Sequence, residues 1–313
     1  MRFGKVLAGY GLILLLYLVV LFMADKSKGF FEYDHVAFAQ LPVLMSLALL
    51  SYGLRYLRWY CLLKWSGHSV PVLGGWWAYL SGFALTATPG KVGELLRIRY
   101  FGRLGASADR VISAFVFERA LDLAVVFVLA AMFIADERMF WLAASFVSLF
   151  LVALVVAGLY PEILMRLSVF CVQKQWMRSS RLFEFLAKVL QGCRAWIKPW
   201  PMVTSLIIGA AAWSLTSIAF VYLLDRLNIQ MPWLEALSTY PMAMLAGAAS
   251  MLPGGVGSTE AAIVLQLKWN DVDTTTALLV AVVIRLSTMW FSVICGFAAI
   301  LFQEIQFVRK AAL

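Results

Sequence analysis

Acidic and basic residues recur at equal spacing in two apolar regions of this 313-residue chain, where ionisable side chains are costly to keep. Glu94 is followed 25 residues later by Arg119, and Glu260 is followed 25 residues later by Arg285. A carboxylate and a guanidinium in such surroundings could form a buried ion pair, or could exchange hydrogen bonds or protons with a polar molecule. The repeated spacing predicts two equivalent units, each with its own Glu and Arg.

Each of these glutamates ends a short segment that is rich in helix-breaking residues. The turn residues are Pro89, Gly90 and Gly93 in TPGKVGE (88–94), and Pro253, Gly254, Gly255 and Gly257 in LPGGVGSTE (252–260). Glycines let a ligand approach the backbone closely, and the amides at a helix start can bind an anion. At membrane depth such backbone is tolerated only inside protein or along a watery cavity. We therefore expect both segments, with Glu94, Arg119, Glu260 and Arg285, to line a polar groove.

The first unit carries more charge than the second. Glu118 and Asp122 lie four residues apart and therefore share one helix face, whereas Ile284 and Thr288 take their places in the second unit. The first unit also has basic residues that could form a funnel for an anionic head group, namely Lys91, Arg97 and Arg99.

Two roles are open for the paired charges. In one, Glu94 with Arg119 and Glu260 with Arg285 are static ion pairs that lock the units together. In the other, the glutamates contact the substrate or carry a proton, since they stand beside glycines that let a ligand come close. We expect the second role for Glu260.

The composition places these residues in an all-α integral membrane protein. The chain is 63% hydrophobic and 14% charged, with a mean hydropathy of +0.86, which is far from a soluble domain. The formal net charge of +9 comes from short segments between apolar runs, which indicates the positive-inside rule rather than nucleic-acid binding. Four cysteines without CxxC spacing and two histidines predict neither a disulfide framework nor a metal site, and we expect no cofactor.

The apolar runs predict about six transmembrane helices, at residues 6–24, 38–63, 111–134, 141–159, 202–224 and 275–301. Two shorter apolar stretches, 76–88 and 237–252, run into the Pro-Gly turns and are predicted to be re-entrant hairpins. Arg55 and Arg58, beside Trp59 at the end of the second span, are typical of a membrane interface.

Charge predicts the topology. With both termini, residues 55–110 and residues 160–200 on the cytoplasmic side, that side has 19 Lys and Arg residues against 5 outside. The two hairpins then enter from opposite faces, as in transporters with inverted repeats. We expect a single domain (1–313) with a first repeat at about 38–134, a basic amphipathic cytoplasmic linker at about 160–200, and a second repeat at about 202–301.

Four motifs, TPGKVGELLR (88–97), FERALDL (117–123), LPGGVGSTEA (252–261) and VIRLS (283–287), resemble the flippase-like family. That family includes the transmembrane flippase region of lysylphosphatidylglycerol synthases (multiple peptide resistance factor). The resemblance implies movement of membrane lipids, such as aminoacylated or polyprenyl-phosphate-linked lipids, across the bacterial inner membrane, with a lipid-modifying enzyme as a partner. The synthase members have a further aminoacyl-transferase domain, whereas this chain ends at Leu313, so we expect no aminoacyl transfer.

The sequence therefore favours a transporter that is not an enzyme, with a groove that carries a polar, anionic or head-group-modified lipid. No nucleotide-binding motif indicates direct use of ATP. Two alternatives stay open: an intramembrane lipid-modifying enzyme that uses the carboxylates as acid and base, and a non-catalytic subunit of a lipid or glycan synthesis complex.

Overall fold

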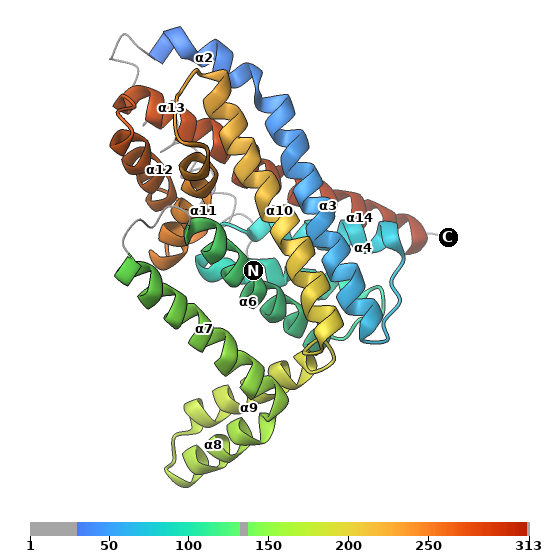
Figure 1. The fold of residues 1–313 in the computed structure, drawn as a ribbon. Coiled ribbons are helices and arrows are strands. Elements are labelled where there is room, and N and C mark those ends of the chain that lie inside the picture. The colour runs from blue at the N-terminus through green and yellow to red at the C-terminus, as the bar shows by residue number, and fades with distance from the viewer. Residues whose placement is uncertain (1–29, 132–136, 312–313) are drawn as a thin grey trace.

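The chain folds into helices and connecting turns throughout residues 30–131 and 137–311, which are the residues that the computed structural model describes (Figure 1). No strand occurs in these ranges. The predicted span at residues 6–24 lies outside them. The α-helices are α2 (Phe30–Ala39), α3 (Leu41–Trp65), α4 (Val72–Ser81), α5 (Arg97–Gly102), α6 (Ala108–Ala131), α7 (Glu137–Leu159), α8 (Pro161–Gln173), α9 (Met177–Cys193), α10 (Pro199–Arg226), α11 (Trp233–Ala249), α12 (Ser258–Trp269), α13 (Thr274–Arg285) and α14 (Phe291–Ala311).

The two long helices α3 and α10 pack side by side in opposite directions (Figure 1). Tyr222, near the end of α10, donates a hydrogen bond to Gln40 just before α3. At the other end, the Trp196 indole donates to the carbonyl of Leu62. With 25 and 28 residues, both helices exceed the ~20 residues that a bilayer crossing requires.

Among the described residues, three stretches are long and apolar enough to cross a membrane: Phe140–Leu159, Pro199–Arg226 and Thr274–Arg309. Helices α3 and α6 have the length but contain charged residues, such as Arg55 and Glu118, within their apolar sequence. The structure thus supports a helical membrane protein. The number of six spans stays a prediction.

Both Pro-Gly segments break the helical path, as the sequence predicts. After α4 the chain narrows to a 3-10 turn (Gly82–Leu85), and a second 3-10 segment (Pro89–Leu96) leads into α5. In the other half a short 3-10 turn (Pro253–Gly255) separates α11 from α12. The two breaks meet, since a Cβ added at Gly254 would lie 3.1 Å from the Cβ of Ala87.

The helix predicted at 275–301 has an interruption that the sequence did not indicate. One π-helical turn, Leu286–Trp290, separates α13 from α14 directly after Arg285. Such a turn widens the helix and displaces backbone carbonyls from their regular partners. One of them, the carbonyl of Thr288, accepts a hydrogen bond from the Tyr52 hydroxyl at 2.6 Å.

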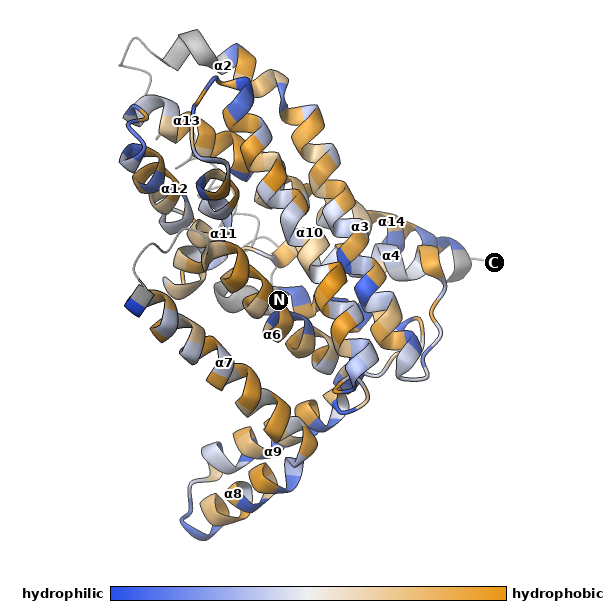
Figure 2. Ribbon diagram, in the orientation of Figure 1, coloured by the Kyte–Doolittle hydropathy of each residue, from blue (hydrophilic) through white to orange (hydrophobic). Residues whose placement is uncertain are grey.

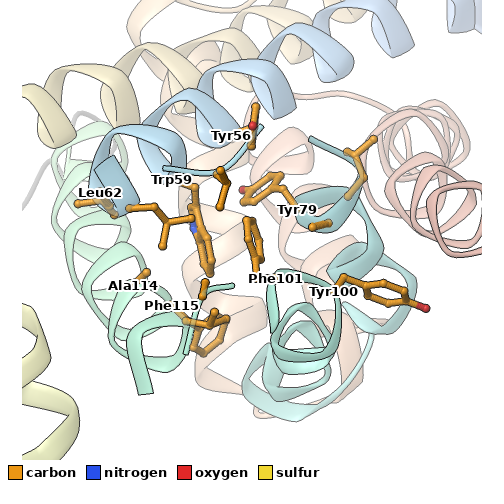
Figure 3. Packing of buried hydrophobic residues seen from close by; sticks show 14 of the residues in the cluster. Tyr56, Trp59, Leu62, Tyr79, Tyr100, Phe101, Ala114 and Phe115 are labelled. Atoms are coloured by element: carbon orange, nitrogen blue, oxygen red, sulfur yellow. The ribbon is translucent and has the colours of Figure 1, made fainter. Parts of the chain in front are cut away.

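Two apolar cores surround these breaks. The first is aromatic: the rings of Trp59 and Phe101 stack with centroids 5.4 Å apart, and Tyr79 packs edge-on against Trp59 (Figure 3). The second is mainly aliphatic and joins α10 to α13, around Phe220 and Ile284. The first core includes Phe83 beside the first break, and the second core packs α11 against α12, the two helices that flank the second break.

Helices α7, α8 and α9 form a lobe that extends from the main bundle (Figure 1). Helices α8 and α9 lie within residues 160–200, the range of the predicted linker. They pack against each other through buried serines, with the Oγ atoms of Ser168 and Ser180 2.9 Å apart.

Candidate functional site

The second break is held by an ion pair between Glu260 and Arg285, which is one of the two roles that the sequence left open. Glycine at 257 adopts φ +83°, which lets the chain turn into α12 two residues before Thr259. Glu260 Oε2 then accepts a hydrogen bond from the Gly257 amide at 2.7 Å, while Oε1 accepts one from Arg285 Nε at 2.7 Å. Arg285 Nη2 also donates to the carbonyl of Gly254 at 2.6 Å. The guanidinium therefore joins α12, α13 and the turn itself.

The first break uses a different pairing. Glu94 forms an ion pair with Arg97, with Oε2 and Nη2 3.2 Å apart, rather than with Arg119. Its other oxygen accepts a hydrogen bond from the Thr86 hydroxyl at 2.9 Å. Equal spacing of Glu and Arg in the sequence thus does not give equal partners, because α5 brings an arginine to Glu94 only three residues away.

Arg97 is buried among aromatic rings instead of lining a cytoplasmic funnel. Its guanidinium carbon lies 4.0 Å from the Tyr79 ring centroid and 5.1 Å from that of Trp59, and its Nε donates to the Tyr79 carbonyl. Cation–π contact replaces part of the hydration that the charge loses on burial. The expectation for Lys91 falls on a side chain outside the described part of the structure.

Arg58 is the residue that sequence reasoning misplaced most clearly. It is fully buried, not interfacial, and its Nη2 donates to Glu118 and to Asp122, each at 2.8 Å. Arg55, three residues earlier in α3, is also buried and donates a hydrogen bond to Asp122 at 3.2 Å. Gly209 on α10 makes the space, since a Cβ there would lie 2.6 Å from Arg58 Nη1. The signal in the sequence was a pair of arginines inside a continuous apolar helix.

Glu118 and Asp122 do share one face of α6, as their spacing predicts. Glu118 accepts a hydrogen bond from the Trp59 indole at 2.6 Å in addition to Arg58. Arg119 lies 3.2 Å from Glu118 and 3.1 Å from Asp122 through Nη2. Charges buried in this way persist only with several partners each.

The network around the first break has one more guanidinium than carboxylates. Its described members are Arg55, Arg58, Arg97 and Arg119 with Glu94, Glu118 and Asp122. Arg119 is the most exposed arginine of the four, with 24% of its side chain accessible. Its Nε has no hydrogen-bond acceptor among the described residues. A positive charge that is partly accessible within a buried network is suited to an anion.

A polar cavity of about 90 Å³ lies where the two breaks meet. Its walls bring together residues of both halves, which include Arg55, Glu94, Arg119, Tyr240, Arg285 and Thr288. Glu260 lies behind Arg285, and within the described structure it is not among the residues that line this cavity. Of the four residues predicted to line the groove, Glu94, Arg119 and Arg285 line this cavity.

A second, mainly apolar cavity of about 270 Å³ adjoins the first. Leu123, Val126, Leu245 and Leu252 are among its lining residues. The two cavities share wall residues, namely Arg119, Trp213, Met244 and Gly254. A polar compartment beside a larger apolar one can hold an amphiphilic molecule, with its charged end at Arg119 and its hydrocarbon on the apolar side.

The turn glycines have different tasks. Gly254 lines both cavities, so its missing side chain leaves the backbone open to them. A Cβ at Gly255 would lie 2.6 Å from Thr259 Oγ1 and 3.1 Å from Gly247 Cα, so Gly255 serves the packing of α11 on α12.

Apolar helices, two interrupted helical paths and a buried charge network define a helical integral membrane protein with a polar site inside the bundle. The chain belongs to the family described as the lysylphosphatidylglycerol synthase TM region, which matches residues 6–296. A search of curated proteins finds no match. Within the described residues no group of three or more His, Cys, Asp or Glu side chains is arranged to hold a metal ion.

Proposed function

We propose that this protein moves a polar, anionic or head-group-modified lipid between the leaflets of a bacterial inner membrane. The family to which the chain belongs is associated with lipid flippase activity. The single observation that carries the proposal is the polar cavity where both helix breaks meet, with Arg119 on the wall that it shares with the apolar cavity.

Electrostatics supports an anionic cargo. A charged head group that enters hydrocarbon loses its water, and each unsatisfied polar group there costs several kcal/mol. The excess guanidinium of the first break supplies an opposite charge, and Arg119, with 24% of its side chain accessible, can reach a head group in the cavity. A phosphate or phosphodiester is suited to this site, because oxyanions accept strong charge-assisted hydrogen bonds from arginine.

The adjoining apolar cavity supports a lipid rather than a water-soluble anion. Alkyl side chains such as Leu123 and Leu252 line it, and a lipid tail would lie there or pass from there into the bilayer. The head group would cross through the polar cavity while its tails remain in an apolar environment.

We further propose the six-span topology with two re-entrant hairpins in an inverted repeat, with both termini cytoplasmic. In that arrangement the two breaks would approach the membrane centre from opposite faces and open alternately. Arg55, Arg58 and Arg97, which were counted among the 19 cytoplasmic Lys and Arg residues, are buried in ion pairs. The proposed orientation therefore depends on the other basic residues on that side.

The test is a leaflet-exchange assay with the purified protein in liposomes. Fluorescent phosphatidylglycerol in the inner leaflet should become accessible to an impermeant quencher faster than in protein-free liposomes. The same samples, analysed for chemically altered lipid, separate transport from lipid modification. Altered lipid without exchange would favour the intramembrane enzyme, and neither result with folded protein would favour a non-catalytic subunit that needs a partner enzyme.

A further inference from the structure

The hairpin of α8 and α9 exposes far more apolar surface than a hydrated linker would. Along α8 only Pro161, Ser168 and Cys171 are buried. The large apolar side chains that stay exposed are Ile163, Met165, Leu167, Val169, Phe170 and Val172. In α9 and just before it, Trp176, Leu182 and Phe185 are exposed as well. An apolar surface of this extent normally contacts another protein or a membrane.

The same hairpin is strongly basic. Residues 161–193 contain five Lys and Arg residues against two acidic residues, Glu162 and Glu184. Arg178, Arg181 and Lys188 are exposed on α9, on the hairpin whose apolar residues appear orange and polar residues blue in Figure 2. The surface therefore attracts anions as well as hydrocarbon.

Length excludes a transmembrane placement for α8. Its 13 residues extend about 20 Å at 1.5 Å per residue, which is less than the ~30 Å of a bilayer core. Its apolar faces are equally unsuited to water. A helix that is too short to span and too apolar to be solvated is stable at the boundary between head groups and acyl chains.

We propose that the α8–α9 hairpin lies in the head-group layer of an anionic phospholipid leaflet. The exposed side chains of α8 insert among the first acyl carbons, and the basic residues of α9 contact lipid phosphates. Trp176, 59% exposed in the turn between the helices, takes the interfacial position that tryptophan prefers. The hairpin thereby fixes the depth of the lobe and concentrates anionic lipid beside the bundle. This placement does not depend on whether the protein transports lipid.

Site-directed spin labelling of the full-length protein tests the placement. A single cysteine replaces Val169 in a variant that lacks Cys61, Cys171, Cys193 and Cys295, and the protein is inserted into nanodiscs at one copy per disc. In discs that contain phosphatidylglycerol, the label should collide more with oxygen than with a water-soluble nickel complex. In discs of phosphatidylcholine alone this preference should fall.

Reference labels calibrate the measurement. Leu149, on exposed α7, provides the hydrocarbon reference, and Asp271 in a polar loop provides the aqueous reference. Glutamine in place of Arg178, Arg181 and Lys188 should shift the inserted fraction toward water by about fivefold for each charge removed. These three side chains are exposed, so the variants leave the buried face between α8 and α9 intact.

Three results would overturn the proposal. A Val169 label as open to nickel as the Asp271 label in anionic discs would mean that the hairpin is hydrated. Equal insertion in neutral and anionic discs would remove the role of the basic residues. Protection that appears only with two copies per disc would assign this surface to a second copy of the chain.

Discussion

Arg285 and Glu260 are joined by a 2.7 Å hydrogen bond between Nε and Oε1, and both residues also bind the backbone of the glycine turn between them. Both oxygens of Glu260 are engaged in this way. The geometry therefore favours a structural role for Glu260, in contrast to the substrate role expected from its place beside the turn.

This role predicts the effect of Glu260→Gln. The substitution leaves the buried Arg285 guanidinium without a counter-charge, which costs about 3–5 kcal/mol of unfolding free energy. We expect a lower melting temperature and less folded protein, measured by thermal unfolding in detergent. The double variant Glu260→Gln/Arg285→Met should recover part of the loss, because it removes both charges. Normal stability of Glu260→Gln with complete loss of exchange would instead restore the substrate role.

A second prediction concerns the buried cation on α3. Arg58→Met leaves Glu118 and Asp122 each without one hydrogen bond of 2.8 Å in a buried site, and should destabilise the protein by about 3–5 kcal/mol. Arg103→Met is the control, because its pair with Glu304 is partly exposed and contributes about 0–1 kcal/mol. Equal melting temperatures for the two variants would contradict the assigned difference in burial.

The third prediction tests topology. In a variant without native cysteines, a cysteine at Asp271 should react with an impermeant thiol reagent added to intact cells. A cysteine at Arg103 should react only after the cells are opened, since the charge distribution places residues 55–110 in the cytoplasm. Identical labelling at both positions would remove the inverted repeat.

The fourth prediction concerns the start of α13, where Asp273 caps the helix. Its Oδ1 accepts hydrogen bonds from the amides of Thr275 and Thr276 at 2.8 and 3.1 Å. Burial raises the pKa of Asp273, but the hydrogen bonds from Thr276 and Thr275 outweigh burial and hold that pKa below its ordinary value. The cap thus contributes stability above the pKa of the unfolded chain, and this contribution is lost as the pH falls through the lower folded value.

Two substitutions at this position separate the cap from the charge. Asp273→Ala should cost about 0.5–2 kcal/mol of unfolding free energy at neutral pH. Asp273→Asn should retain most of the capping and lose the acid dependence that this residue contributes. Thermal unfolding at pH 7 and near pH 3 measures both, and an identical acid response of Asp273→Asn and wild type would contradict the assignment.

Sequence patterns predicted those features that depend on local chemistry. Proline and glycine within apolar runs predicted both helix breaks, and the helix spacing of Glu118 and Asp122 predicted their common face. The ion pair of Glu260 with Arg285 was one of two roles that the repeated spacing left open, and the other, contact with the substrate or a proton, was the one expected for Glu260. The ion-pair partners in the first half could not be predicted from local spacing. Arg58 reaches Glu118, which is 60 residues away in the chain, through space left by Gly209. The π-turn after Arg285 was likewise not predicted, and its Thr288 carbonyl accepts a hydrogen bond from Tyr52, a residue 236 positions away in the chain.

Lipid exchange by Arg119→Met tests most directly whether Arg119 receives an anionic lipid head group. Arg119 is partly exposed, with 24% of its side chain accessible, and without it Glu118 and Asp122 still pair with the fully buried Arg58, so the variant should fold. A charge-assisted hydrogen bond contributes about 1.5–3 kcal/mol, so phosphatidylglycerol exchange in liposomes should slow by roughly 10- to 100-fold. Arg226→Met, at an exposed residue outside both cavities, should exchange lipid at the wild-type rate. Wild-type exchange by folded Arg119→Met would contradict the account.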